Sequence, residues 1–186
     1  MTNHWIDIQN SDVIMVIGSN AAENHPMSMK WINKARKDNG ATLIHVDPRF
    51  TRTSAVSDLY CRLRSGTDIA FIGGIIHAVL TDMEANPGNF NMEYVLNYTN
   101  ARFKVADGYA FDAGDGTFSD KATTWMYDLD GDGQAIVVAP EDVWDPASGS
   151  VLNAMKVHYA RYTVDNVCKV TGSDPTVYQQ VIDTYK

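Results

Sequence analysis

Side chains that can hold a nucleotide come directly after a short apolar run in the first third of the sequence. Asp47 follows the run Thr42–Val46, and Arg49 and Thr51 come next. A carboxylate can accept two hydrogen bonds from a guanine edge or a ribose diol, and a guanidinium can bind phosphate oxygens. These residue types at the end of a buried element indicate a nucleotide site. An Asp-Pro turn at Asp47 and Pro48 is the alternative without a ligand.

A second polar loop follows another apolar run, residues 12–17. It contains Gly18, Asn20, Glu23 and Asn24, and it occupies the position at which a dinucleotide-binding fold keeps its phosphate loop. The loop lacks the G-x-G-x-x-G spacing, so ordinary NAD binding is disfavoured. Asn20 and Glu23 could bind a ligand, or could equally cap and brace the helix that follows.

A third loop precedes a long apolar helix that the sequence predicts. Gly66, Thr67 and Asp68 stand at the start of an apolar segment that ends near Met83. The backbone N–H groups at a helix N-terminus favour anions such as phosphate. We therefore group this loop with the other two as a candidate nucleotide site.

The apolar runs that lead into these loops predict an α/β fold. They are continuous rather than alternating, which is typical of parallel strands covered on both faces. Pro26 and a helical stripe predict a helix between the first two runs, and so a right-handed β–α–β unit. We expect a Rossmann-like parallel sheet with flanking helices and an irregular stretch at 50–58. The expected strands are 12–17, 42–46 and 59–63, and the expected helices are 26–38, 68–83, 92–98, 151–162, 163–169 and 174–185.

Three segments are expected along the chain. Residues 1–100 form the dinucleotide-binding-like α/β unit. Residues 101–150 form an irregular β-rich insertion, because glycine, aspartate and aromatic residues dominate there and 125–127 could pair with 135–138 as a hairpin. Residues 151–186 form a helical segment that packs back on the α/β unit.

The composition disfavours several classes of function. The net charge of −8 at pH 7 argues against a sequence-independent nucleic-acid binder, which needs a basic face. No apolar run approaches the roughly 20 residues of a membrane-spanning helix, and we see no signal-peptide pattern at the N-terminus. Cys61 and Cys168 lie far apart, and no Cys/His spacing predicts an iron–sulfur cluster or a structural zinc. Cys61 is expected to be buried and unreactive.

An aspartate-rich segment matches half of a calcium-binding loop. Asp128, Asp130 and Asp132 have the spacing of its first ligands, but the twelfth position is Ala139 instead of the required glutamate. A solvated hairpin tip is therefore the favoured interpretation. No metal ligand and no catalytic residue is assigned within the chain.

With these motifs in place, the chain resembles the large subunit of formate dehydrogenase. The resemblance is closest to the selenocysteine-containing, respiratory or periplasmic branch of the molybdopterin oxidoreductases, and it covers the whole chain. It is carried by the stretches 1–5, 18–26, 47–53, 64–70, 94–100 and 157–164.

The resemblance implies a bis-(molybdopterin guanine dinucleotide) cofactor with molybdenum or tungsten, and oxidation of formate to carbon dioxide or the reverse reaction. The first loop, the loop after the second strand and the third loop would together hold the nucleotide. By this resemblance the cofactor-binding residues are Gly18, Asn20, Glu23, Asn24, Asp47, Arg49, Thr51, Gly66, Thr67 and Asp68.

The same resemblance implies that the chain corresponds to an internal part of such a subunit. The family's four-cysteine iron–sulfur motif and its selenocysteine or cysteine metal ligand precede the residue that matches Met1, and its second pterin-nucleotide domain follows Lys186. The isolated chain is therefore expected to be inactive. The implied partners are the rest of the large subunit and an electron-transfer iron–sulfur subunit, in a periplasmic location. The alternative is a stand-alone nucleotide-binding or structural module without catalytic activity.

Overall fold

The computed structural model describes residues 3–106 and 127–186. Its contacts divide the chain into two units. The first comprises Met1–Val79 with Arg161–Lys186, and the second comprises Leu80–Ala160. All of the residues predicted to bind the cofactor belong to the first unit. The division into segments 1–100, 101–150 and 151–186 stays a prediction.

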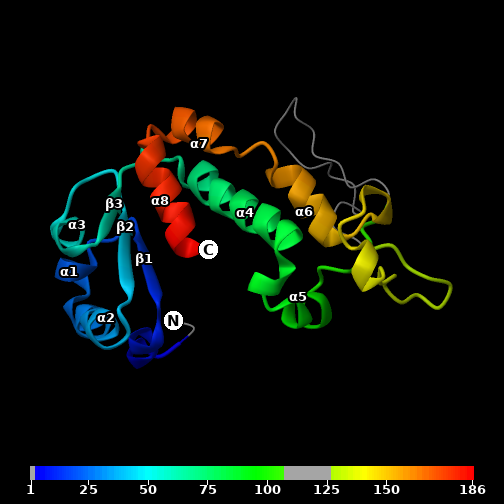
Figure 1. The fold of residues 1–186 in the computed structure, drawn as a ribbon, viewed down its shortest axis with the longest axis horizontal. Coiled ribbons are helices and arrows are strands. Elements are labelled where there is room, and N and C mark those ends of the chain that lie inside the picture. The colour runs from blue at the N-terminus through cyan, green and yellow to red at the C-terminus, as the bar shows by residue number, and fades with distance from the viewer. Residues whose placement is uncertain (1–2, 107–126) are drawn as a thin grey trace. The chain divides into compact units, whose positions relative to one another are not determined.

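The first unit is built on a three-stranded parallel sheet, which confirms the α/β class (Figure 1). The strands are β1 (Val13–Ile17), β2 (Thr42–Val46) and β3 (Leu59–Cys61). Strand β2 lies between the other two and pairs with both in parallel. Its continuous run of β-branched and apolar residues is buried from Leu43 onward, as expected for a strand covered on both faces.

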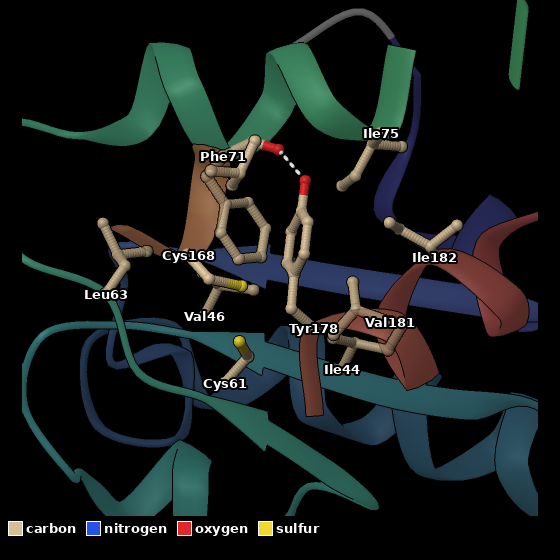
Figure 2. Packing of buried hydrophobic residues seen from close by; sticks show 11 residues of the cluster. Ile44, Val46, Cys61, Leu63, Phe71, Ile75, Cys168, Tyr178, Val181 and Ile182 are labelled. Atoms are coloured by element: carbon tan, nitrogen blue, oxygen red, sulfur yellow. Dashed lines mark hydrogen bonds between the residues drawn. The ribbon is translucent and has the colours of Figure 1, made fainter. Parts of the chain in front are cut away.

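Alternate residues of β2 face two different layers, because successive side chains of a strand point to opposite faces. Ile44 and Val46 belong to a buried cluster with residues of three helices, α4 (Asp68–Ala85), α7 (Val164–Thr171) and α8 (Pro175–Tyr185). Figure 2 shows this cluster, which also contains Cys61. Cys61 is buried, as predicted, and burial raises the pKa of its thiol to about 11.

Tyr178 of α8 closes this cluster against α4. Its hydroxyl donates to the backbone oxygen of Phe71 at 2.7 Å, and the two rings meet edge to face with centroids 4.9 Å apart (Figure 2). Gly74 makes this approach possible, since a Cβ there would stand 2.2 Å from the Tyr178 hydroxyl. The last helix is thereby held against the one that follows β3.

Three short elements of the first unit are absent from the sequence-based expectation. They are a 3-10 helix at Trp5–Asn10, α1 (Ala21–Asn24) and α3 (Arg52–Val56). The expected irregular stretch at 50–58 was therefore wrong in part. Helix α3 is too short to show a hydrophobic period, and it is started by side chains: the Thr51 hydroxyl accepts from the Thr53 N–H, and Ser54 Oγ accepts from the Thr51 N–H.

The longer helices agree with the prediction to within a few residues. Helix α2 (Pro26–Asn39) begins at its proline and ends at Gly40, which is left-handed. Thr163 and Asp174 cap α7 and α8 by accepting backbone hydrogen bonds. Helix α6 (Val151–Tyr159) ends at Tyr159 instead of the expected Tyr162.

The second unit contains α5 (Met92–Tyr98), α6 and isolated antiparallel bridges. Short 3-10 helices occur at Pro87–Asn89, Pro140–Asp142 and Pro146–Ser148. Leu129 bridges Ala135, so a hairpin forms at this place, but Tyr127 bridges Val105 and Val137 bridges Phe103 instead of pairing with each other as predicted. Trp125 and Met126 lie outside the described residues. Within 3–106 and 127–186, no helix has both the length and the apolarity to cross a membrane.

Candidate functional site

The polar loops that the sequence singles out all follow the carboxyl ends of strands. Since β1, β2 and β3 are parallel, these ends lie at one edge of the sheet. Ligands of open α/β sheets bind outside this edge. The structure therefore gathers the predicted residues on the side of the sheet where a ligand is expected.

The first loop leaves β1 through Gly18, whose φ of 64° lies in the left-handed region that favours glycine. Gly18 stays tied to the sheet, because its N–H donates to the oxygen of Val46 at 2.9 Å. Asn20 directly precedes α1, and its side-chain amide donates to the Glu23 carboxylate. The Asn24 side-chain oxygen accepts a hydrogen bond from His25 Nδ1 at 2.7 Å. The loop is thus held by its own side chains.

Helix α3 binds the first loop directly. Thr53, which is buried, accepts from the Ala22 N–H at 3.0 Å and donates to the Asn20 side-chain oxygen at 3.1 Å. Arg52 Nε lies 3.0 Å from Glu23 Oε1, on the exposed surface. Asn20 and Glu23 are therefore tied to each other and to α3, and the Asn20 side chain makes no capping bond to the helix that follows it. Their contact with a ligand stays a prediction.

His45 lies under both segments and was missed by sequence reasoning. It is fully buried on β2. Its Nε2 lies 3.1 Å from the backbone oxygen of Ser19, and its Nδ1 lies 2.8 Å from Ser54 Oγ. Burial lowers the pKa of the His45 imidazole, partly offset by the Ser19 carbonyl and the Asp47 carboxylate. The only sequence signal for this role is a histidine inside an otherwise apolar run.

The loop after β2 carries a carboxylate, Asp47, and a guanidinium, Arg49, that can contact a ligand. Asp47 is half-buried, and its Oδ1 accepts from the Arg49 N–H at 2.7 Å in a local turn. The Tyr60 hydroxyl fixes the same loop by donating to the Asp47 backbone oxygen at 2.9 Å. Among the described residues, nothing donates a hydrogen bond to Asp47 Oδ2, and the exposed Arg49 side chain forms no ion pair. This loop is both a turn and a candidate contact surface.

An exposed aromatic ring flanks the same loop. Phe50 is 63% exposed, and its ring meets the edge of Tyr60 at 5.2 Å between centroids. Tyr60 also stacks on His45 at 5.9 Å. Thr51, by contrast, is buried and serves the start of α3. Of the predicted residues in this loop, Asp47 and Arg49 are the ones that a ligand can reach.

The third loop is joined to the C-terminal part of the unit. Gly66 has a φ of 80°, and the Thr67 hydroxyl donates to the backbone oxygen of Arg64 at 2.7 Å. The Arg64 N–H in turn donates to the oxygen of Thr171 at 2.7 Å. Asp68, which is exposed, is the first residue of α4. Hydrogen bonds thus connect the first loop with α3. The third loop lies at the same edge of the sheet but is bonded to the C-terminal part of the unit instead.

A shallow depression lies at the other edge of the sheet. It has a volume of about 630 Å³ and is lined by Asn33, Arg36, Lys37, Gly40, Ala41, Thr42 and Asp58. Arg36 crosses it to bind Asp58 Oδ1 at 2.5 Å and the oxygen of Val56 at 3.0 Å. This depression is at the amino ends of β2 and β3, away from the predicted residues.

The acidic hairpin in the second unit is organised by its own hydrogen bonds. Asp128 pairs with Lys104 at 2.7 Å, and Asp130 Oδ1 accepts from the N–H groups of Asp132 and Gln134, each at 2.9 Å. Asp130 is therefore used as a turn-forming residue. Within the described residues, no group of His, Cys, Asp or Glu side chains is arranged to hold a metal ion.

Comparison with known proteins identifies relatives over the whole chain. The family model described as molybdopterin oxidoreductase matches residues 1–157. The chain is 46% identical over 197 residues to formate dehydrogenase 2 subunit alpha (cytochrome c-553) of Nitratidesulfovibrio vulgaris, covering 100% of this chain and 18% of the relative. It is 45% identical over 191 residues to formate dehydrogenase subunit alpha of Megalodesulfovibrio gigas, again covering 100% and 18%.

A relative in Escherichia coli and one solved structure add to this result. The nitrate-inducible formate dehydrogenase major subunit is 43% identical over 190 residues, covering 94% of this chain and 17% of the relative. The acetylene hydratase of Pelobacter acetylenicus superposes with a TM-score of 0.55 at 20% identity, covering 92% of this chain and 16% of that one, which concerns the fold alone. The chain therefore spans about 18% of the length of the curated relatives that it matches first.

Proposed function

Because this chain belongs to the molybdopterin oxidoreductase family, we propose that it is the part of a formate dehydrogenase catalytic subunit that binds a cofactor nucleotide. The cofactor would be a bis-(molybdopterin guanine dinucleotide), with molybdenum or tungsten. In the complete enzyme it supplies the redox chemistry that converts formate to carbon dioxide. The identity of 43–46% to formate dehydrogenase subunits supports this choice of enzyme.

One observation carries the proposal. At the carboxyl edge of the sheet, Asp47 keeps Oδ2 outside its turn while the adjacent Arg49 guanidinium stays exposed. The donor set of a guanine nucleotide matches this pair, because guanine offers N1–H and N2–H₂ to a carboxylate and its phosphates accept from a guanidinium. The residues therefore fit the nucleotide part of the group. The parallel pairing of β1, β2 and β3 supports the same placement.

The division of labour within this edge follows from the hydrogen bonds. Asp47 would orient the base, and Arg49 would neutralise phosphate charge. Gly18, with no side chain, would let the backbone approach the ligand closely, and Gly66 would do the same in the third loop. Asn20, Glu23 and Thr51 would keep the loops in register with α3. Thr67, Asn24 and Asp68 complete the predicted set at the rim.

The remaining machinery would come from outside these residues. The sequence has two cysteines, and both are buried in the first unit. The iron–sulfur ligands and the metal ligand, selenocysteine or cysteine, would belong to other polypeptide segments. We propose the rest of the large subunit and an electron-transfer iron–sulfur subunit as partners, in a periplasmic location. The isolated chain should show no formate oxidation with artificial electron acceptors.

The proposal is tested by nucleotide titration of the isolated chain. We expect GDP to bind more tightly than ADP, because adenine lacks the N1–H and N2–H₂ donor pair. Because the chain would supply one of two nucleotide-binding domains, the isolated chain should bind weakly. We expect a Kd of ~0.1–1 mM, which corresponds to a binding free energy of roughly 4–5.5 kcal/mol. Calorimetry gives the affinities, and NMR shifts should centre on Gly18, Asp47 and Gly66. Equal affinities, or shifts remote from these residues, would contradict the proposal, and no binding at all would favour a structural module.

A further inference from the structure

The buried histidine on β2 is held in a single protonation state by its two partners. The Ser19 oxygen is a carbonyl and can only accept, so His45 Nε2 carries a hydrogen and donates to it at 3.1 Å. In the neutral ring, Nδ1 then has a free lone pair and accepts from the Ser54 hydroxyl at 2.8 Å. His45 is fully buried, so water offers neither nitrogen a replacement partner.

The hydrogen bonds of His45 continue into a directed chain. The Thr51 N–H donates to Ser54 Oγ at 2.8 Å, Ser54 donates to His45 Nδ1, and His45 Nε2 donates to Ser19. The chain therefore runs from the start of α3, through β2, to the loop after β1. The Ser54 hydroxyl has one short acceptor, His45 Nδ1, and one distant one, Thr51 Oγ1 at 3.5 Å, so reversing the His45 bond moves the Ser54 hydrogen to the weaker position.

The surroundings of the ring favour the neutral form. Ser54 comes from α3, Ser19 from the first loop, and the Tyr60 ring stacks from β3 at 5.9 Å. The charged group that faces the ring is Asp47, on the same strand end. Burial opposes the imidazolium and outweighs both the carboxylate and the Ser19 carbonyl, so the pKa of His45 lies below its usual value.

We infer that neutral His45 is a positioning residue of the carboxyl edge, which locks the loop after β1 to the start of α3, and that its protonation releases both. Protonation makes Nδ1 a donor. Ser54 Oγ then receives hydrogen bonds from both His45 and Thr51, and its own hydrogen exchanges His45 Nδ1 for Thr51 Oγ1, which lies 3.5 Å away. A buried hydroxyl with so long a hydrogen bond is poorly satisfied and the imidazolium beside it is buried, so this arrangement favours opening.

The consequence for ligand binding rests on the proposed nucleotide site. Asn20 directly follows Ser19 in the first loop and binds Glu23. Thr51 lies at the other end of the chain of hydrogen bonds. Release of these segments would loosen the edge that Asp47 and Arg49 occupy. The sign follows from the lowered pKa of His45: the lock is complete above the usual histidine range and is lost as the pH falls through the lowered pKa.

The first test reads the lock without a ligand. NMR of the isolated chain between pH 8 and pH 4 should show the His45 ring as the Nε2–H tautomer at pH 7. The amide signals of Ser19 and Ser54 should then move together on acidification, with the midpoint of the His45 ring and before global unfolding. An Nδ1–H tautomer, or loop signals that move with a different midpoint, would overturn the inference.

A matched variant separates positioning from packing. His45→Gln retains a side-chain amide that can donate to Ser19 but has no proton to gain in this pH range. It should fold and should lose the joint movement of the loop signals. Should the joint movement persist in His45→Gln, another group drives it and His45 is not the lock. The wild-type titration decides the matter alone if the variant does not fold.

The second test adds GDP as the probe. From pH 7 to a pH below the His45 midpoint, wild-type affinity should fall by about 2- to 10-fold, which corresponds to one ordinary hydrogen bond. The affinity of His45→Gln should change less. If GDP does not bind at any pH, the proposed function fails, and the tautomer and the loop signals still decide the role of His45. If both proteins lose affinity equally, the positioning role is overturned.

Discussion

The two edges of the three-stranded sheet use charge in opposite ways. At the amino edge, Arg36 binds Asp58, and Asp58 Oδ2 accepts from the Leu43 N–H at 2.8 Å, so the carboxylate is shared between a helix and a strand. At the carboxyl edge, Asp47 holds only its own turn, and Arg49 extends into solvent. A shallow depression of about 630 Å³ lies at the amino edge. The availability of hydrogen-bonding atoms, rather than the size of a hollow, therefore distinguishes the candidate site.

The largest expected effect comes from breaking the carboxyl edge. In the complete enzyme, Asp47→Ala should lower cofactor affinity by roughly 10- to 150-fold, or about 1.5–3 kcal/mol, because a charge-assisted contact is lost in a desolvated site. The apo-fold should lose no more than about 1 kcal/mol, since the side chain serves one local turn. Arg49→Ala should act in the same direction.

The measurement is metal and guanine nucleotide per polypeptide, beside the thermal midpoint of the apo form. Asp58→Ala serves as the control at the amino edge and should leave occupancy unchanged. Full occupancy in Asp47→Ala would make Asp47 a turn former only, and the assignment of this loop would be abandoned.

The reverse pattern is expected at the amino edge. Asp58→Ala should destabilise the isolated chain by about 1–2 kcal/mol, because the Leu43 N–H of a buried strand loses its acceptor. The value lies in the lower part of the usual range because the Asp58 side chain is 40% exposed. Urea unfolding gives the change, and Asp38→Ala, in an exposed pair with Lys34, should show none. A loss of GDP affinity in Asp58→Ala would erase the contrast between the edges.

The smallest expected changes in stability concern two contacts that hold α3 to the first loop. Arg52 is 78% exposed in its pair with Glu23, so Arg52→Ala should change the free energy of unfolding by less than about 0.5 kcal/mol. Thr53→Val keeps the shape but removes a buried hydroxyl with two partners, and should cost about 1 kcal/mol. Equal effects in urea titrations would show that the exposed ion pair holds α3 to the first loop as strongly as the buried hydroxyl does, against this prediction.

Sequence reasoning succeeded where a local pattern determines the structure. The run Thr42–Val46 predicts β2 to the residue, and Pro26 and Gly40 delimit α2 closely. Parallel pairing then follows from short loops and continuous apolarity, so the gathering of polar loops at one edge could be predicted as well. Whether Asp47 and Arg49 touch a ligand stays a prediction.

The contacts that join these loops could not be predicted in the same way. Thr53 meets Asn20 and Ala22 across more than 30 residues of sequence, and no periodicity signals such a pairing. His45 has two partners from different segments, which a single histidine in an apolar run does not reveal. Helix α3 depends on the side chains of Thr51 and Ser54 rather than on a hydrophobic stripe. Side-chain hydrogen bonds between distant segments therefore account for most of what was missed.

The contact of Tyr178 with α4 has a consequence during synthesis of the chain. The apolar face formed by Ile44, Val46 and Cys61 is covered in part by residues of α8, which the ribosome adds well after β3. At roughly 5–20 residues per second, that face waits on the order of ten seconds for its cover. A nascent sheet exposed for this time is a natural target for chaperones. A chain that stops before Tyr178 would leave this apolar face exposed and prone to aggregation.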